Sequence, residues 1–143
     1  MKIRVIIITC LLAGVAVQAQ NKLPQGKWTV EQVTIEKNTD GNLQTTVYNT
    51  AAEVKSYIPC PQEWEIGTEN ILLRYSDGSE ESTALAFEGN KLKIAAAGAL
   101  QLYNYSITGN TLTLTITHNY RYNNPEGQME RIEEKWTIIL KKQ

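Results

Sequence analysis

The stretch 103–118, YNYSITGNTLTLTITH, decides the fold class of this protein. Apolar and polar residues alternate on both sides of Gly109-Asn110, and a period of two is typical of a half-buried β-strand. A Gly-Asn pair between two such runs favours a two-residue type II′ turn, because glycine readily takes the positive φ of the first turn position. The resulting register aligns the apolar residues on one face, with the pairs Ile107–Leu112, Tyr105–Leu114 and Tyr103–Ile116.

Three other turn signals predict hairpins of the same kind. Gly89-Asn90 pairs Phe87 with Leu92. A three-residue loop at 76–78, with Gly78 left-handed, brings Arg74 opposite Glu80 and buries no charge. A three-residue loop at 39–41 is interpreted in the same way. It predicts the pairs Val33–Val47 and Ile35–Thr45.

The predicted strands are 27–38, 42–49, 64–75, 79–88, 91–96, 99–108, 111–122 and 129–141. Sequential hairpins with one apolar face favour an all-β fold, an eight-stranded antiparallel up-and-down meander that closes into a barrel. A two-sheet sandwich is the alternative. The one long link, 49–63, either forms one or two helical turns over 51–58 that cap a barrel mouth, or is a surface loop.

The first 19 residues have the pattern of a secretory signal peptide. A basic start precedes an apolar run, and Val17-Gln18-Ala19 offers small residues for cleavage after Ala19. We therefore expect export to the periplasm or the extracellular medium, with 20–143 as one domain. The alternatives are an uncleaved anchor and lipid attachment at Cys10. After cleavage only Cys60 remains, so no internal disulfide is expected, and no further transmembrane segment follows.

Composition argues against several function classes. The chain has 14 basic and 15 acidic residues and a net charge of −1, whereas a nucleic-acid binder needs a basic face. One histidine and two cysteines are too few for an ordinary metal site. The acidic pairs 80–81 and 133–134 point to opposite faces of their strands and form no acid–base couple. We expect no catalytic residues, no cofactor and no enzymatic activity.

Gly26-Lys27-Trp28 opens the first predicted strand and resembles the Gly-x-Trp signature of the lipocalin and calycin families. The run Tyr105–Leu114 is also similar to small secreted bacterial lipocalin-like domains. The resemblance implies that Trp28, with Gly26, plugs one end of the barrel. It also implies an arginine stacked on the tryptophan, for which Arg131 is the candidate, and a lipid or pigment as ligand. The chain departs from that pattern at the C-terminus, where no helix follows the last strand.

A set of aromatic residues and one histidine shares the inward face in these registers. They either fill the core or line a pocket in which hydroxyl groups orient a small hydrophobic ligand. We expect a secreted or periplasmic lipocalin-like protein that binds a small apolar or amphipathic molecule. The alternative is a non-enzymatic interaction module, an inhibitor or envelope assembly factor, that acts through the exposed loops 49–63 and 119–128 on a protein partner that remains unknown. The candidate ligand-binding residues are Tyr75, Tyr103, Tyr105, His118, Tyr120 and Trp136.

Overall fold

The computed structural model describes residues 22–56, 58–96 and 98–143. The predicted signal peptide and Cys10 lie outside the described residues. The described chain is built from antiparallel strands and one short 3₁₀ turn, η1 (Ala51–Glu53). The strands are β1 (Gly26–Thr39), β2 (Asn42–Tyr48), β3 (Glu63–Ile66), β4 (Asn70–Arg74), β5 (Glu80–Glu88), β6 (Lys91–Ala96), β7 (Ala99–Thr108), β8 (Thr111–Asn123) and β9 (Met129–Lys142).

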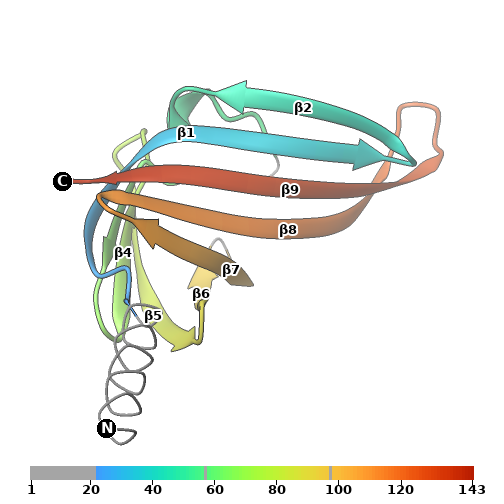
Figure 1. The fold of residues 1–143 in the computed structure, drawn as a ribbon. Helices are drawn as coiled ribbons and strands as arrows, with labels where there is room; N and C mark the ends of the chain where they lie inside the picture. Colours follow the sequence, from blue (N-terminus) through green and yellow to red (C-terminus); the bar gives the residue numbers. More distant parts are fainter. Residues whose placement is uncertain (1–21, 57, 97) are drawn as a thin grey trace, which may run out of the picture.

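Eight of these strands close into a barrel, as the alternation of apolar residues predicts. β3 to β9 pair in chain order, β3 pairs with the start of β1, and β9 returns to pair with β1 along most of its length. The ring of β1 and β3–β9 is visible in Figure 1. This closure confirms the barrel and is incompatible with the two-sheet sandwich.

The eighth wall strand is not the expected one. The predicted strand 64–75 is in fact a hairpin of β3 and β4, which turns where the backbone N–H of Gly67 donates to the carbonyl of Asn70 at 2.9 Å. A Cβ at position 67 would lie 2.9 Å from that carbonyl oxygen, so the turn depends on glycine. The predicted strand 42–49 is present as β2, but its predicted place in the wall was wrong, because β2 lies outside the ring and pairs only with β1 among the described strands.

The Gly-Asn turns behave as their sequence predicts. Gly89 and Gly109 both have φ of 60°, and the pairs Phe87–Leu92, Ile107–Leu112 and Tyr105–Leu114 are all formed. The predicted pair Tyr103–Ile116 is not formed. The β7–β8 ladder ends at Asn104–Thr115, beyond which β7 follows β6 and β8 follows β9.

The predicted register of the first hairpin was wrong by one residue. Asp40 and Gly41 have φ of 48° and 90°, as a two-residue type I′ turn requires, and they connect the closing pair Thr39–Asn42. Val33 therefore opposes Tyr48 rather than Val47, and Ile35 opposes Thr46 rather than Thr45. A one-residue slip exchanges the faces of a strand, so Val47 lies on the outer face, 52% exposed.

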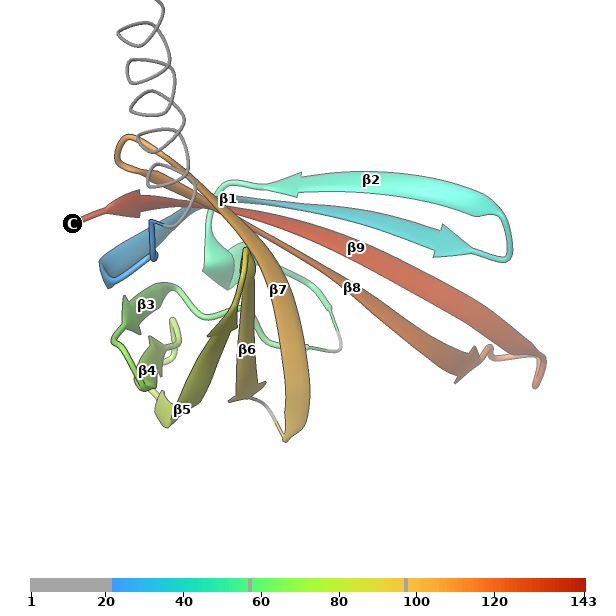
Figure 2. The same cartoon turned by 60° about the horizontal axis from the view of Figure 1, so that its bottom comes forward.

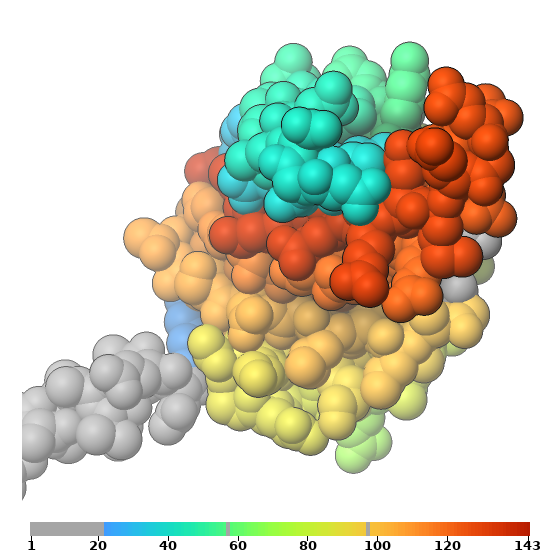
Figure 3. All heavy atoms as spheres, turned by 90° about the vertical axis from the view of Figure 1, so that its right-hand side faces the viewer, coloured from blue at the N-terminus to red at the C-terminus, as the bar shows by residue number. Residues whose placement is uncertain are grey.

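Four strands extend beyond the rest of the barrel. Figures 1 and 2 show the long ribbons of β1, β2, β8 and β9 running past the short strands β4–β7. We call the projecting four-stranded sheet the arm; its strand order is β2-β1-β9-β8. The tips of its two hairpins lie side by side in Figure 3, and there the N–H of Asp40 donates to the carbonyl of Arg131 at 3.2 Å.

The barrel interior is filled with apolar side chains from every wall strand. For the link between β2 and β3, the alternatives were one or two helical turns over 51–58 or a surface loop; the described residues have one 3₁₀ turn, and the link packs on the core. Among the described residues of the link, only Ala51–Glu53 is helical; Ala51 and Cys60 are buried, and Val54 and Ile58 pack against the core. Within the described residues, no helix is long and apolar enough to cross a membrane.

Candidate functional site

Trp28 lies buried at the end of the barrel where β1 begins and β9 ends. Its indole Nε1–H donates to the carbonyl of Pro24 at 2.9 Å, and the side chain is only 2% exposed. The ammonium of Lys142 lies 5.4 Å from the centroid of the Trp28 ring, which is a cation–π geometry. Gly26 has φ of 119°, and a Cβ there would lie 3.3 Å from the Lys142 side chain.

The candidate cation for this tryptophan, Arg131, was wrong. Because β9 runs antiparallel to β1, Lys142 is directly opposite Trp28 in the ladder. Arg131 lies at the far end of β9, in the arm, where it opposes Arg121. The position in the ladder, not the type of cation, decides which side chain reaches the ring.

Tyr103 and Tyr105 are parts of the packed interior. The hydroxyl of Tyr103 donates to the buried amide oxygen of Gln101, and its ring meets Trp64 edge to face at 5.4 Å. The hydroxyl of Tyr105 donates to the carbonyl of Gly89 at 3.0 Å. Burial raises the pKa of both phenols. Both hydroxyl groups are therefore satisfied by protein atoms.

Tyr75, which directly follows β4, is half-buried and packs against the core. Its hydroxyl donates to Glu81 at 3.1 Å beside a surface cavity of about 570 Å³, which Cys60 also lines. Burial, then the bond to Glu81, raises the pKa of Tyr75 to about 12. Burial alone raises the pKa of the Cys60 thiol to about 12, which keeps this cysteine in its unreactive protonated form.

His118, Tyr120 and Trp136 are brought together where the arm leaves the barrel. The imidazole of His118 meets the indole of Trp136 edge to face, with ring centroids 5.6 Å apart. Between β8 and β9, His118 opposes Glu134, a buried carboxylate that is 3% exposed. Tyr120 donates to Glu134 Oε1 at 2.7 Å, and Trp136 Nε1–H donates to Oε2 at 2.9 Å.

Ser56, from the β2–β3 link, also belongs to this group. We call His118, Tyr120, Glu134, Trp136 and Ser56 the mouth cluster. Its hydroxyl donates to Glu134 Oε2 at 2.9 Å, so the link is attached to the wall of the barrel. Burial by itself would raise the pKa of Glu134, but the three hydrogen bonds and the charge of Lys37 lower it below its usual value. Burial also lowers the pKa of His118, with a smaller opposing effect from Glu134. The cluster thus favours a carboxylate beside a neutral imidazole.

Glu134 is the central residue that the sequence interpretation missed. Alternation correctly places Glu133 and Glu134 on opposite faces. This excludes an acid–base couple between the two, but it does not exclude a buried role for Glu134 alone. Counting back from Trp136 in steps of two reaches Glu134 and then Ile132, both buried. The alternation that predicts the inward face of β9 therefore contained the signal for an inward carboxylate.

A cavity of about 330 Å³ opens beside the mouth cluster, where β7 and β8 separate. Because the ladder ends at Asn104–Thr115, the start of β7 and the end of β8 leave a gap that Ile58 borders. Leu100 on its rim is 70% exposed. The lining residues are Ile58, Ala99, Leu100, Gln101, Thr117, His118, Asn119 and Tyr120.

The mouth cluster contains the residue types of a serine–histidine–acid triad, but the contacts are in the wrong order. A triad needs the serine hydroxyl on the imidazole and the imidazole on the acid. Here Ser56 donates directly to Glu134. The described residues contain no group of three or more His, Cys, Asp or Glu that could hold a metal ion.

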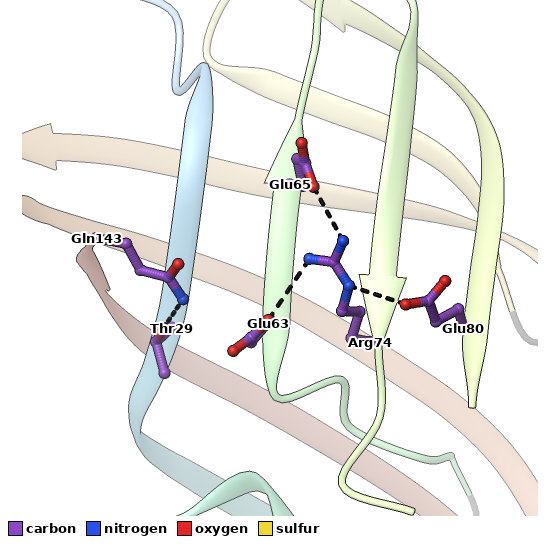
Figure 4. A network of polar contacts seen from close by, with 6 residues as sticks. All are labelled: Thr29, Glu63, Glu65, Arg74, Glu80 and Gln143. Atoms are coloured by element: carbon purple, nitrogen blue, oxygen red, sulfur yellow. Dashed lines mark hydrogen bonds and ion pairs between the residues drawn. The ribbon is translucent and has the colours of Figure 1, made fainter. Parts of the chain in front are cut away.

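The ion pairs of Arg74 lie on the outside of the barrel, where they join wall strands rather than form a site. Arg74 reaches Glu63, Glu65 and Glu80 at 3.5, 3.3 and 3.0 Å, as Figure 4 shows. These contacts connect β3, β4 and β5 across the wall and include the predicted pair of Arg74 with Glu80. Gln143 donates to Thr29 in the same view and attaches the C-terminal residue to β1.

Comparison of the chain with protein-family models, curated proteins and solved structures finds no match. The functional argument therefore depends on the geometry of the barrel mouth.

Proposed function

We propose that this protein is an exported, lipocalin-like β-barrel that binds a small amphipathic molecule at the mouth of the barrel. The observation that carries the proposal is the cavity between β7 and β8, which the apolar Leu100 and Ile58 line together with the polar groups of His118 and Tyr120. Apolar walls with a few convergent polar groups are typical of small-molecule sites, and about 330 Å³ is at the small end of their range.

The mouth is favoured over the interior of the barrel as the ligand site. The fully buried residues Leu112, Leu114 and Ile138 line neither this cavity nor the cavity beside Tyr75. Tyr103 and Tyr105 direct their hydroxyl groups to protein acceptors. A ligand therefore fits beside the core, not in place of it.

The charges around the cavity restrict the polar group of the ligand. Glu134 lies behind His118 and Tyr120 with its pKa lowered, so its carboxylate is negative at neutral pH. An anionic group would be repelled there, whereas a neutral or cationic hydrogen-bonding group would not. The ligand class is a compact apolar body with an uncharged polar or amine group.

The test is binding of the neutral amphipathic dye N-phenyl-1-naphthylamine, followed by its fluorescence. Leu100→Asp should weaken binding at least about tenfold, because it removes most of one exposed apolar wall. Leu102→Asp is the matched control: Leu102 lies two residues along β7, is 43% exposed and does not line the cavity. It should change affinity less than about twofold. Absence of dye binding, or equal loss in both variants, would contradict the proposal.

Catalysis is not part of the proposal, because the contacts of Ser56 and Glu134 do not form a triad. Export is tested separately by N-terminal sequencing of the protein recovered from outside the cytoplasm. The mature chain should begin at Gln20. Recovery of a chain that still carries Met1 would contradict cleavage after Ala19.

The second candidate function is an interaction module. The link 49–63 is a weaker candidate surface than expected, because Ser56 attaches it to Glu134 and Cys60 is buried. The arm tip favours this function more: the turn at Asp40 is hydrogen-bonded to Arg131, near the start of β9, and both hairpins project from the barrel. A stable complex that survives Leu100→Asp would favour this candidate over the ligand site.

A further inference from the structure

The outer strand of the arm, β2, has a free edge. It pairs with β1 along Asn42–Tyr48 and with no other described strand. In Figure 2, β2 lies at the margin of the arm with no strand beyond it. β1 and β9 pair to close the barrel wall, but β2 lies outside that closure, so its free edge lacks the protection that a closed barrel provides.

The turn at Asp40-Gly41 determines which backbone groups face outward. In a two-residue turn the closing pair, Thr39–Asn42, is hydrogen-bonded, and hydrogen-bonded pairs then alternate along the ladder. Positions 42, 44, 46 and 48 therefore direct their backbone groups to β1. The N–H and C=O groups of Leu43, Thr45 and Val47 point away from the sheet.

The same three residues form one face of the strand. Thr46 and Tyr48 oppose Ile35 and Val33, which are buried, so they belong to the inner face. Leu43 and Val47 lie on the outer face and are 62% and 52% exposed. Exposed apolar side chains and outward backbone groups are thus carried by the same positions.

Natural edge strands are usually protected by lysine, proline, a bulge or extreme shortness. The segment 42–48, NLQTTVY, contains no charged residue, no proline and no glycine. The ladder with β1 has no register shift along this segment. Its composition is that of strands that readily accept another strand.

We propose that β2 is a self-association edge, on which a second copy of this chain pairs its own β2 antiparallel around a two-fold axis at Thr45. In this register Leu43 faces Val47 of the second copy, Val47 faces its Leu43, and Thr45 faces Thr45. A shift of two residues in either direction leaves Leu43 or Val47 without its apolar counterpart. Gln44 faces Thr46 on the inner side, and no charged side chains meet.

The pattern of the strand is the argument for a second copy rather than a different protein. Two-fold pairing requires a segment that is complementary to itself when reversed. Apolar residues at 43 and 47, polar residues at 44 and 46, and a central threonine satisfy this requirement. Pairing would join two four-stranded arms into one continuous sheet.

Sedimentation velocity between about 1 μM and 1 mM tests the association. An edge this short should give a dimer dissociation constant of about 10 μM or weaker. Thr45→Pro removes only an outward N–H, so it should abolish the dimer while leaving the β1–β2 ladder intact. Thr45→Lys places two like charges at the axis and should weaken association at least about tenfold. Ser106→Lys, an exposed change on β7, should alter association less than about twofold.

Disulfide capture tests the register, in a chain with Cys10 replaced by serine and Cys60 buried. Thr45→Cys should form a covalent dimer on mild oxidation. Thr46→Cys is the control, because that residue lies on the inner face and opposite Gln44 in the proposed register. A protein that stays monomeric at every concentration, or equal capture of both variants, would overturn the proposal.

Discussion

Glu134 holds three segments together at the mouth of the barrel. Side chains from the β2–β3 link, β8 and β9 donate to one carboxylate that is 3% exposed. A buried acceptor of this kind is costly to remove, because each donor is then left without its partner. Its effect is therefore greater than that of an exposed glutamate on the same strand.

Glu134→Gln should lower the free energy of unfolding by about 1–3 kcal/mol, since an amide cannot accept all three hydrogen bonds. Urea denaturation measures the change. Glu133→Gln is the matched control, because Glu133 is the exposed neighbour on β9, and it should change stability by less than about 0.5 kcal/mol. Equal effects of the two substitutions would contradict the role of Glu134.

Trp28→Ala should destabilise the barrel by about 3–5 kcal/mol, the range for a deleted buried large aromatic side chain. The indole is almost fully buried, donates to Pro24 and lies under the ammonium of Lys142. Equilibrium denaturation measures the loss. A loss below about 1 kcal/mol would mean that Trp28 does not close the barrel end.

In the arm, two like charges occupy opposed positions of one ladder. Arg121 of β8 and Arg131 of β9 are directly opposite each other, and neither has an ion-pair partner within 4.0 Å among the described residues. Like charges at opposed positions destabilise a ladder. The arm tip is therefore less stable than the same ladder near Leu114 and Ile138, where both residues are buried.

Arg121→Glu should stabilise the protein by about 0.2–1 kcal/mol, because it replaces a repulsive cross-strand pair with an attractive one. Thermal denaturation at low salt measures the gain. In an Arg131→Gln background the same substitution should give no such gain, which separates the pair from a general effect of net charge. A gain of equal size in both backgrounds would argue against the pairing.

The molecule as a whole should lose stability in acid. The pKa of His118 is lowered in the folded protein, so below about pH 6.5 the unfolded chain binds more protons than the folded one. Glu134 also has a lowered pKa, so its contribution is present at neutral pH and is lost as the pH falls below about 4.5. Both groups act in the same direction.

We therefore expect the free energy of unfolding to decrease from pH 7 to pH 4. His118→Gln should flatten this dependence in its upper part, near pH 6, and leave the lower part unchanged. Urea denaturation across this pH range measures both effects. A protein whose stability is constant between pH 7 and pH 5 would contradict the lowered pKa of His118.

Local chemistry alone determined the class of fold. Alternation around Gly109-Asn110 and Gly89-Asn90 predicted inward faces, and registers that the structure confirms near the turns, because turn type and a period of two are properties of neighbouring residues. The same reasoning was wrong at Asp40-Gly41, where two-residue and three-residue turns both connect plausible strands. The structure has the two-residue turn, with positive φ at Asp40 and Gly41, and in its register Tyr48 opposes the buried Val33 and packs against the core.

Tertiary structure decided the parts on which the proposals depend. The pairings of the closed sheet decide where β7 and β8 separate, which cation reaches Trp28 and which strand remains outside the ring. These pairings join segments that are not adjacent in the sequence. Alternation places His118 and Glu134 on inward faces, but only the β8–β9 ladder places them opposite each other. Sequence periodicity specifies the face of a residue; barrel closure specifies its neighbours.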